Sequence, residues 1–271
     1  MNRLLITGDT GFIGSYLKKR LTSDYEVEGV SRRDGIDITD MESLERLQSV
    51  PDVIIHGAAL ATDDYEAAYE ANVTGTLNIC RYAKIRGVKK MVLLSTIFAA
   101  DHPENGYYNS YGQTKRIAEE VAEAYCKAHR IELTVLRLAQ VYDDARLAQK
   151  GQAMLYYFVD TISKEGKISL FGRSNPLRNY IHIEYLCSVI EEIILSDVRG
   201  LWYVTEEKSH TIAEIAYMLF GLYRQYPDIT WLTEKPDIPT VYIPQKQRYQ
   251  SDNIPSIPLE EGLQRIINYE R

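Results

Sequence analysis

A tyrosine and a lysine four residues apart, Tyr111 and Lys115, are well suited to acid–base chemistry. Residues i and i+4 of a helix lie on one face, so the two side chains become neighbours if this segment is helical. A nearby ammonium favours the phenolate and lowers the pKa of a tyrosine from its reference of about 10. The pair therefore predicts a general acid or base that works near neutral pH. A chain with 21 tyrosines also produces this spacing by chance, so its position must support the prediction.

Two hydroxyl residues, Ser95 and Thr96, stand at the end of the apolar run that precedes this pair. The carboxyl ends of parallel strands open onto the ligand cleft of an α/β sheet. Either hydroxyl is therefore expected to hydrogen-bond a substrate oxygen held beside Tyr111.

A glycine-rich turn spans residues 7–14 and contains Gly8, Gly11 and Gly14 at the spacing G-x-x-G-x-x-G. Glycines allow a tight turn and close approach to a ligand, and the N–H groups of the following helix can bind a pyrophosphate. The spacing differs from the G-x-G-x-x-G of the dinucleotide fingerprint, and an ordinary strand–helix turn is the alternative.

The residues after the second predicted strand bear on cofactor choice. An NAD enzyme tends to place an acidic residue there, on the ribose hydroxyls. Here Ser31, Arg32 and Arg33 follow Val30, and two guanidinium groups suit the extra phosphate of NADP. NADP is therefore favoured over NAD. A solvated basic turn is the alternative, and the nearby Asp34 complicates the choice.

Alternating strand-like and helix-like segments must position these residues. Near-continuous apolar strands separated by helices predict a Rossmann-type α/β fold, a doubly wound parallel sheet covered on both faces. The predicted strands are 3–6, 25–30, 52–56, 90–95 and 132–138, and the predicted helices are 12–21, 41–48, 64–86 and 110–129.

The alternation of strand-like and helix-like segments becomes less regular after Tyr142. It predicts helices at 154–163 and 184–195, strands at 168–171 and 201–204, and a capping box at 211–214 that opens another helix. Six of the nine prolines fall in the last fifty residues, which predicts turns and short pieces there. We expect a cofactor-binding domain over 1–142, with 181–204 returning to it, and a smaller C-terminal substrate-binding lobe built from 143–180 and 205–271.

Composition excludes several classes of protein. A net charge of −7 argues against nucleic acid as the main partner. Cys80, Cys126 and Cys187 lie far apart without metal-ligand spacing, so we expect no metal site and interpret Cys80 and Cys126 as core residues in a reducing compartment. Neither a signal peptide nor a membrane span is visible, which predicts a cytoplasmic protein.

Taken together, these segments resemble the extended short-chain dehydrogenase/reductases of the NAD(P)-dependent epimerase/dehydratase type. The resemblance covers nearly the whole chain, and its pieces occur in the family's order. They are T-G-x-x-G-F-I-G at 7–14, Asp37-Ile38, D-V-I-I-H-G-A-A at 52–59, N-V-T-G-T at 72–76, L-S-T at 94–96, Y-G-Q-T-K at 111–115, Leu136-Arg137 before Val141-Tyr142, and R-N-Y-I-H-I at 178–183.

The resemblance implies a role for each matching residue. Tyr111 exchanges a proton with the substrate oxygen while a hydride moves between substrate and nicotinamide, Thr96 orients that oxygen, and Lys115 holds the ribose and lowers the tyrosine pKa. Ser95 remains an alternative to Thr96, as a substrate-binding hydroxyl. Arg178 matches an arginine that grips a substrate diphosphate. The expected cofactor contacts are Gly8, Gly11, Phe12, Ile13, Gly14, Ser31, Arg32, Arg33, Asp37, Ile38, Ala58, Ala59 and Lys115, whereas Asn72, His56 and His182 are expected to be structural.

One departure from the family's pattern limits the reactions that we expect. Ile97 and Phe98 follow Thr96, where the family's dehydratases carry an Asp-Glu pair, so dehydration is not expected. The resemblance then implies 4-keto reduction or epimerisation of a nucleoside-diphosphate sugar. The alternatives are a carbonyl reductase or alcohol dehydrogenase for a non-nucleotide substrate, and a dinucleotide-sensing protein without catalysis. A homodimer packed through 64–86 and 110–129 is also expected.

Overall fold

The computed structural model describes residues 3–102, 105–244 and 246–269. Its centre is a six-stranded sheet with the order β10-β5-β4-β3-β1-β2, in which every neighbouring pair is parallel. This confirms the predicted doubly wound α/β fold. The strands are β1 (Arg3–Thr7), β2 (Glu26–Val30), β3 (Val53–His56), β4 (Lys90–Thr96), β5 (Glu132–Leu138) and β10 (Gly200–Val204).

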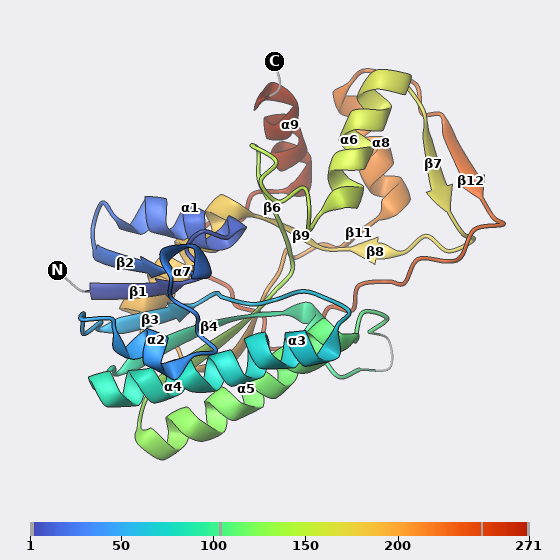
Figure 1. Ribbon diagram of the computed structural model, residues 1–271. Helices are drawn as coiled ribbons and strands as arrows, with labels where there is room; N and C mark the ends of the chain where they lie inside the picture. The colour runs from blue at the N-terminus through green and yellow to red at the C-terminus, as the bar shows by residue number, and fades with distance from the viewer. Residues whose placement is uncertain (1–2, 103–104, 245, 270–271) are drawn as a thin grey trace.

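Helices cover both faces of this sheet (Figure 1), which explains why its strands are apolar at successive positions. Alternate residues of one strand face opposite sides, so Leu4 and Ile6 join one core and Leu5 joins the other. The first core contains α1 (Phe12–Leu21) and α7 (Ile183–Leu195), and the second contains α2 (Met41–Glu45), α4 (Gly75–Arg86) and α5 (Ser110–His129).

The predicted helix at 64–86 is confirmed, with one wide turn inside it. Helical structure runs without a gap through α3 (Tyr65–Tyr69), a π-helical turn at Glu70–Thr74, and α4. The turn contains the fully buried Asn72. This turn was not predicted from the sequence, and such turns occur often at functional sites.

A third core lies beyond the sheet (Figure 1) and joins α6 (Ala153–Glu165), α8 (Ile212–Leu222) and α9 (Leu259–Tyr269). Beside it β7 (Ile168–Phe171) pairs in parallel with β12 (Ile229–Leu232). Among the described residues, the stretch from Pro227 to Pro258 is mostly turns and short pieces, as its prolines predict. The helix α9 follows it, and Leu259, Leu263, Ile266 and Ile267 form one buried helical face. The two-lobe division and its boundaries stay a prediction.

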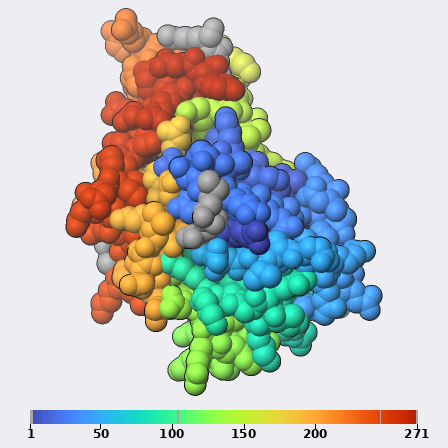
Figure 2. Space-filling view, turned by 90° about the vertical axis from the view of Figure 1, so that its left-hand side faces the viewer, coloured from blue at the N-terminus to red at the C-terminus, as the bar shows by residue number. Residues whose placement is uncertain are grey.

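Short strand pairs connect the sheet to this third core. They are β6 (Gln140–Tyr142) with β9 (Tyr180–His182), and β8 (Leu177–Arg178) with β11 (His210–Thr211). The C-terminal part of the chain, orange to red, covers one flank of the molecule (Figure 2). Among the residues described, none of the helices combines the length and apolar character needed to cross a bilayer.

Candidate functional site

Two glycines of the 7–14 turn are fixed by close backbone contacts. Gly8 has a φ of +74°, and a Cβ there would lie 2.8 Å from the backbone of Ala58. A Cβ on Gly14 would lie 2.2 Å from the carbonyl oxygen of Gly8, so only glycine lets α1 start this close to β1. Gly14 therefore packs the helix against the turn and does not line a cavity.

A cavity of about 550 Å³ opens at the ends of β1, β2 and β3. Nine of the expected cofactor residues line it: Gly8, Gly11, Ser31, Arg32, Arg33, Asp37, Ile38, Ala58 and Ala59. The start of α1 lies at its edge, where Gly11 is the cap residue and offers no capping side chain. The free N–H groups of this first turn suit a pyrophosphate, so the residues present fit a dinucleotide.

The basic pair at the end of β2 lies in this cavity wall. Arg32 and Arg33 are exposed, and no hydrogen bond or ion pair holds either guanidinium within the described ranges. Asp34 does not pair with them, because its Oδ2 accepts a hydrogen bond of 2.6 Å from Ser31 Oγ. Both positive charges are therefore available to a ligand.

A second cavity, of about 490 Å³, contains Thr96 and Tyr111. Phe12 and Ile13 also line it, one and two residues after Gly11 of the first cavity. The first turn of α1 thus stands between the two cavities, and a ligand that crosses this turn extends from the arginine pair to Tyr111.

The two candidate hydroxyls have different surroundings. Thr96 Oγ1 accepts a hydrogen bond of 3.2 Å from the Phe98 N–H, which leaves its own proton to donate to a ligand. Ser95 lines the same cavity, but its Oγ donates to the buried Glu119 carboxylate. Glu119 in turn forms an ion pair of 2.6 Å with Arg137. Successive strand residues point to opposite faces, which explains the difference.

Lys115 does not lower the pKa of Tyr111 in this structure. Its Nζ is buried and donates a hydrogen bond of 2.8 Å to the carbonyl oxygen of Leu94. Burial raises the pKa of Tyr111 to about 12. Burial also lowers the pKa of Lys115 to about 8, and the charge of Glu119 opposes that shift. The expected direction for the tyrosine is therefore reversed, because desolvation of the phenolate dominates.

Buried side chains tie the two cavities together. Asn72 Nδ2 donates to the Leu60 carbonyl at 2.9 Å and to Thr114 Oγ1 at 3.0 Å, and its Oδ1 accepts from the Leu60 N–H. Leu60 lines the first cavity and Thr114 precedes Lys115. Asn72 thus acts as a brace between the cofactor cavity and the start of α5, in agreement with a structural role.

His56 and His182 also lie in structural positions. His56 is fully buried between Thr7 Oγ1 at 2.6 Å and Thr76 Oγ1 at 3.0 Å. Burial, and then the charge of Lys115, lowers the pKa of His56 to about 3, so it stays neutral. His182 caps α7 and contacts Asp144 at 3.0 Å.

Arg178 does not line the Tyr111 cavity. It is 3% exposed, and its Nη1 donates to the carbonyl oxygens of Leu177 at 2.7 Å and Pro239 at 2.8 Å. Its Nη2 donates to the Tyr107 hydroxyl at 2.9 Å, and the guanidinium lies over the Tyr107 ring. In this structure the arginine joins β8 to the segment around Pro239 and does not face a ligand cavity.

Two amides of the Tyr111 cavity, Gln140 and Gln152, were not predicted from the sequence. Gln140 Nε2 donates to Gln152 Oε1 at 3.2 Å, and both residues line the cavity. Gln140 follows the carboxyl end of β5, and that position was the available signal. Among the described residues that line this cavity there is no lysine or arginine.

Comparisons with known proteins agree with this architecture. A family model described as the NAD dependent epimerase/dehydratase family matches residues 4–200. UDP-glucuronic acid decarboxylase 1 of Danio rerio is 25% identical over 302 residues, covering 98% of this chain and 72% of that protein. A putative UDP-glucose 4-epimerase of Methanocaldococcus jannaschii is 24% identical over 304 residues, covering 98% and 97%.

Solved structures show the same fold. The UDP-glucose 4-epimerase of Thermus thermophilus, in complex with NAD, superposes with a TM-score of 0.77 at 22% identity. The dTDP-4-dehydrorhamnose reductase of Bacillus anthracis, in complex with NADP, gives the same two values. Each comparison covers 98% of both chains. The family match spans most of the 271 residues and confirms the resemblance found in the sequence, so the chain belongs to the NAD-dependent epimerase/dehydratase family.

Proposed function

We propose that the protein uses NAD(P) to reduce a 4-keto group, or to epimerise a hydroxyl carbon, on a nucleoside-diphosphate sugar. The observation that carries this proposal is the shared boundary of the two cavities at the first turn of α1. A dinucleotide held by the glycine turn and the end of β2 extends past this turn toward Thr96 and Tyr111. When bound, its nicotinamide supplies or accepts the hydride.

The catalytic residues in this proposal are Thr96, Tyr111 and Lys115. Tyr111 exchanges a proton with the substrate oxygen through its hydroxyl, and Thr96 Oγ1 donates a hydrogen bond to the same oxygen. The buried ammonium of Lys115, fixed by the Leu94 carbonyl, contributes positive charge at the ribose. A tyrosine with a pKa of about 12 is protonated near neutral pH, which suits a proton donor to a substrate carbonyl.

The cofactor favoured by this reasoning is NADP. Arg32 and Arg33 line the dinucleotide cavity without an internal partner among the described residues, as a binding site for an added phosphate requires. NADPH is a consumable reductant, which agrees with reduction. Structural neighbours were solved as complexes with NAD and with NADP, so the preference must be measured.

The names of the relatives support a sugar nucleotide as substrate. They include UDP-glucuronate 4-epimerase of Thermodesulfobacterium geofontis, which is 26% identical over 87% of this chain. In this proposal Gln140 and Gln152 present amide groups to sugar hydroxyls within the Tyr111 cavity.

A second candidate function follows from the charge of that cavity. Arg178 is engaged by protein oxygens, and the described lining of the cavity includes Asp63 but no cationic side chain. An uncharged carbonyl substrate fits such a cavity better than a diphosphate does. We therefore retain a carbonyl reductase or alcohol dehydrogenase as the alternative.

Fluorescence titration with NADPH and NADH tests the proposed cofactor preference first, after any retained dinucleotide has been identified. NADPH binding at least tenfold tighter, about 1.4 kcal/mol, supports the arginine pair and a reductase. Tightly retained NAD, or no preference, contradicts the arginine argument and moves the proposal to an epimerase.

Activity assays then separate the substrate classes. A 4-keto sugar nucleotide, a UDP-hexose and nucleotide-free ketones are compared under the same conditions. Turnover of the first supports reduction, interconversion of UDP-hexose epimers supports epimerisation, and turnover of ketones alone supports the alternative. Dinucleotide binding without turnover of any of them would point to a sensor.

We further propose that the chain dimerises through α4 and α5. Tyr65 and Tyr69 of α3 and Ile85 of α4 are exposed by 44%, 41% and 60%. Covering them in a four-helix bundle removes apolar surface from water. Light scattering at micromolar concentration tests this, and a monomer there contradicts it.

A further inference from the structure

Two cysteines meet where α4 packs against α5. The thiols of Cys80 of α4 and Cys126 of α5 lie close enough for each to be the main influence on the pKa of the other. They are 0% and 1% exposed and share one core with Ala83 and Ala122 of the same helices. Small residues at a helix crossing reduce the distance between the axes, which brings the two cysteines closer together.

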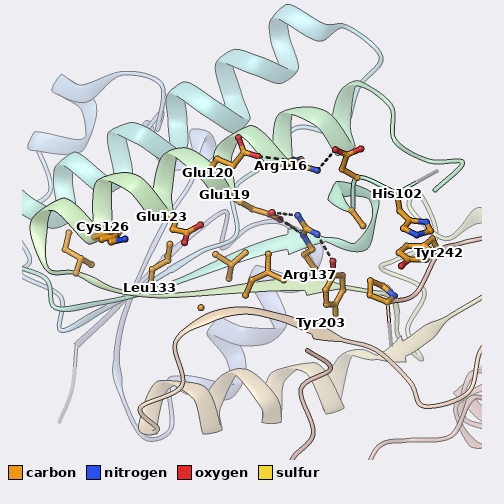
Figure 3. A pocket seen from close by; sticks show the side chains of 18 residues that line it. His102, Arg116, Glu119, Glu120, Glu123, Cys126, Leu133, Arg137, Tyr203 and Tyr242 are labelled. Atoms are coloured by element: carbon orange, nitrogen blue, oxygen red, sulfur yellow. Dashed lines mark hydrogen bonds and ion pairs between the residues drawn. The ribbon is translucent and has the colours of Figure 1, made fainter. Parts of the chain in front are cut away.

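A third cavity, apart from the two already described, reaches one member of this pair. It has a volume of about 580 Å³ and lies between α5, β5 and β10 (Figure 3). Cys126 lines one end of it, whereas the stacked rings of His102 and Tyr242 stand at the other. Small molecules in this cavity therefore meet Cys126 first, and Cys80 lies behind it.

We propose that Cys80 and Cys126 form an oxidisable dithiol, which closes to a disulfide between α4 and α5 when a peroxide enters this cavity. The Cys126 thiolate attacks one peroxide oxygen, so that sulfenic acid forms and water leaves. The sulfur of Cys80 then attacks the sulfenic sulfur, an S–S bond forms, and a second water leaves. Overall, two thiols are oxidised by two electrons and one hydrogen peroxide is reduced to two waters.

The electrostatics of the pair agree with this order of events. The contact with Cys80 lowers the pKa of the Cys126 thiol, and the same contact together with burial raises the pKa of Cys80. Cys126 lines the cavity and Cys80 does not, so Cys126 meets the peroxide first and Cys80 resolves the intermediate. Burial raises the pKa of the third cysteine, Cys187, to about 12, and Cys187 lies in the core on the opposite sheet face.

We expect the disulfide to raise the stability of the protein and to leave the Tyr111 cavity intact. The cross-link closes a loop of more than forty residues, which restricts the unfolded chain. Cys126 follows Lys115 by eleven residues on α5, or about 16 Å along the helix, so the catalytic segment need not move.

The full-length protein treated with dilute hydrogen peroxide tests the proposal. We expect free thiols to fall from three to one per chain, and mass spectrometry to show one peptide pair joining Cys80 to Cys126 with two hydrogens lost. The Tm should rise by about 5 °C or more, and dithiothreitol should reverse both changes.

Variants and the possible products keep the test decisive. Cys187→Ala should behave like the parent chain, and Cys80→Ala should lose both the cross-link and the peroxide-dependent rise in Tm. A Cys126 that is sulfinylated while Cys80 stays free would overturn the proposal, as would a disulfide between two chains. Thiols that react only above the Tm would overturn it as well.

Discussion

The arginine pair at the end of β2 and the buried Arg178 have opposite surroundings. Arg32 and Arg33 are exposed in the wall of the dinucleotide cavity. Arg178, by contrast, is 3% exposed and donates to Leu177, Pro239 and Tyr107. An arginine whose donors already have protein acceptors gains little from a ligand, whereas one held only by water can exchange it for a phosphate. The comparison shows that a motif locates an arginine but does not determine its partners.

Replacing Tyr111 with phenylalanine should give the largest effect, because it removes the proton donor and leaves the dinucleotide end intact. We expect kcat to fall about 10³-fold, while the Kd for NADPH changes less than about twofold. Steady-state kinetics and fluorescence titration measure the two quantities. A variant that keeps its turnover would remove Tyr111 from the mechanism.

Replacing Lys115 with methionine tests the buried charge that the Leu94 carbonyl holds. The pKa of Lys115 is about 8 in the folded chain against a reference of 10.5, so between these values only the unfolded chain keeps the proton. The contribution of Lys115 to the free energy of unfolding therefore rises with pH through this window. Relative to the variant, the parent chain should gain about 2 kcal/mol between pH 7 and pH 10.

Urea unfolding of both proteins across this pH range measures that gain. The hydrogen bond to Leu94 is lost in the variant at every pH. Its loss therefore changes the difference in free energy of unfolding between the two proteins by a constant amount and does not affect how that difference depends on pH. A difference that stays flat with pH would mean that Lys115 is not desolvated.

Replacing Arg178 with lysine tests whether this arginine stabilises the fold or binds a ligand. A single ammonium cannot reach the acceptors that the planar guanidinium joins, so we expect the free energy of unfolding to fall by about 2 kcal/mol. The affinity for NADPH should stay unchanged. Unaltered stability combined with a raised substrate KM would instead place Arg178 at the substrate.

Replacing Arg32 and Arg33 together with alanine tests whether the pair binds the added phosphate of NADPH. We expect the Kd for NADPH to rise about tenfold, or about 1.4 kcal/mol, and the Kd for NADH to stay within about twofold. Lys19→Ala is the matched control, because Lys19 is an exposed cation outside the cavity lining. Equal losses for both dinucleotides would show that the pair does not read the added phosphate.

The sheet could be predicted from the sequence because its strands are apolar throughout and flanked by helical patterns. The predicted strand at 132–138 coincides with β5, and that at 90–95 ends one residue before β4 does. The turn at Glu70–Thr74 was not predicted, because helical structure continues directly on both sides of it.

Side-chain partners distant in sequence were the least predictable part of the site. Motifs placed nine cofactor candidates around one cavity, yet they gave no sign that Ser95 would donate to Glu119. Pro239 accepts from Arg178 across sixty-one positions of sequence. The pKa of Tyr111 was misjudged for a similar reason, because its direction depends on how far the fold desolvates the phenol.

The place of β10 at the edge of the sheet has a consequence for biosynthesis. Its partner β5 ends at Leu138, and β10 begins at Gly200. About sixty further residues must therefore leave the ribosome before the open edge of β5 is covered. An unpaired edge can capture other chains, so we expect the half-made polypeptide to depend on chaperones during this interval. A protein cut after Tyr142 would keep that edge open permanently and should aggregate.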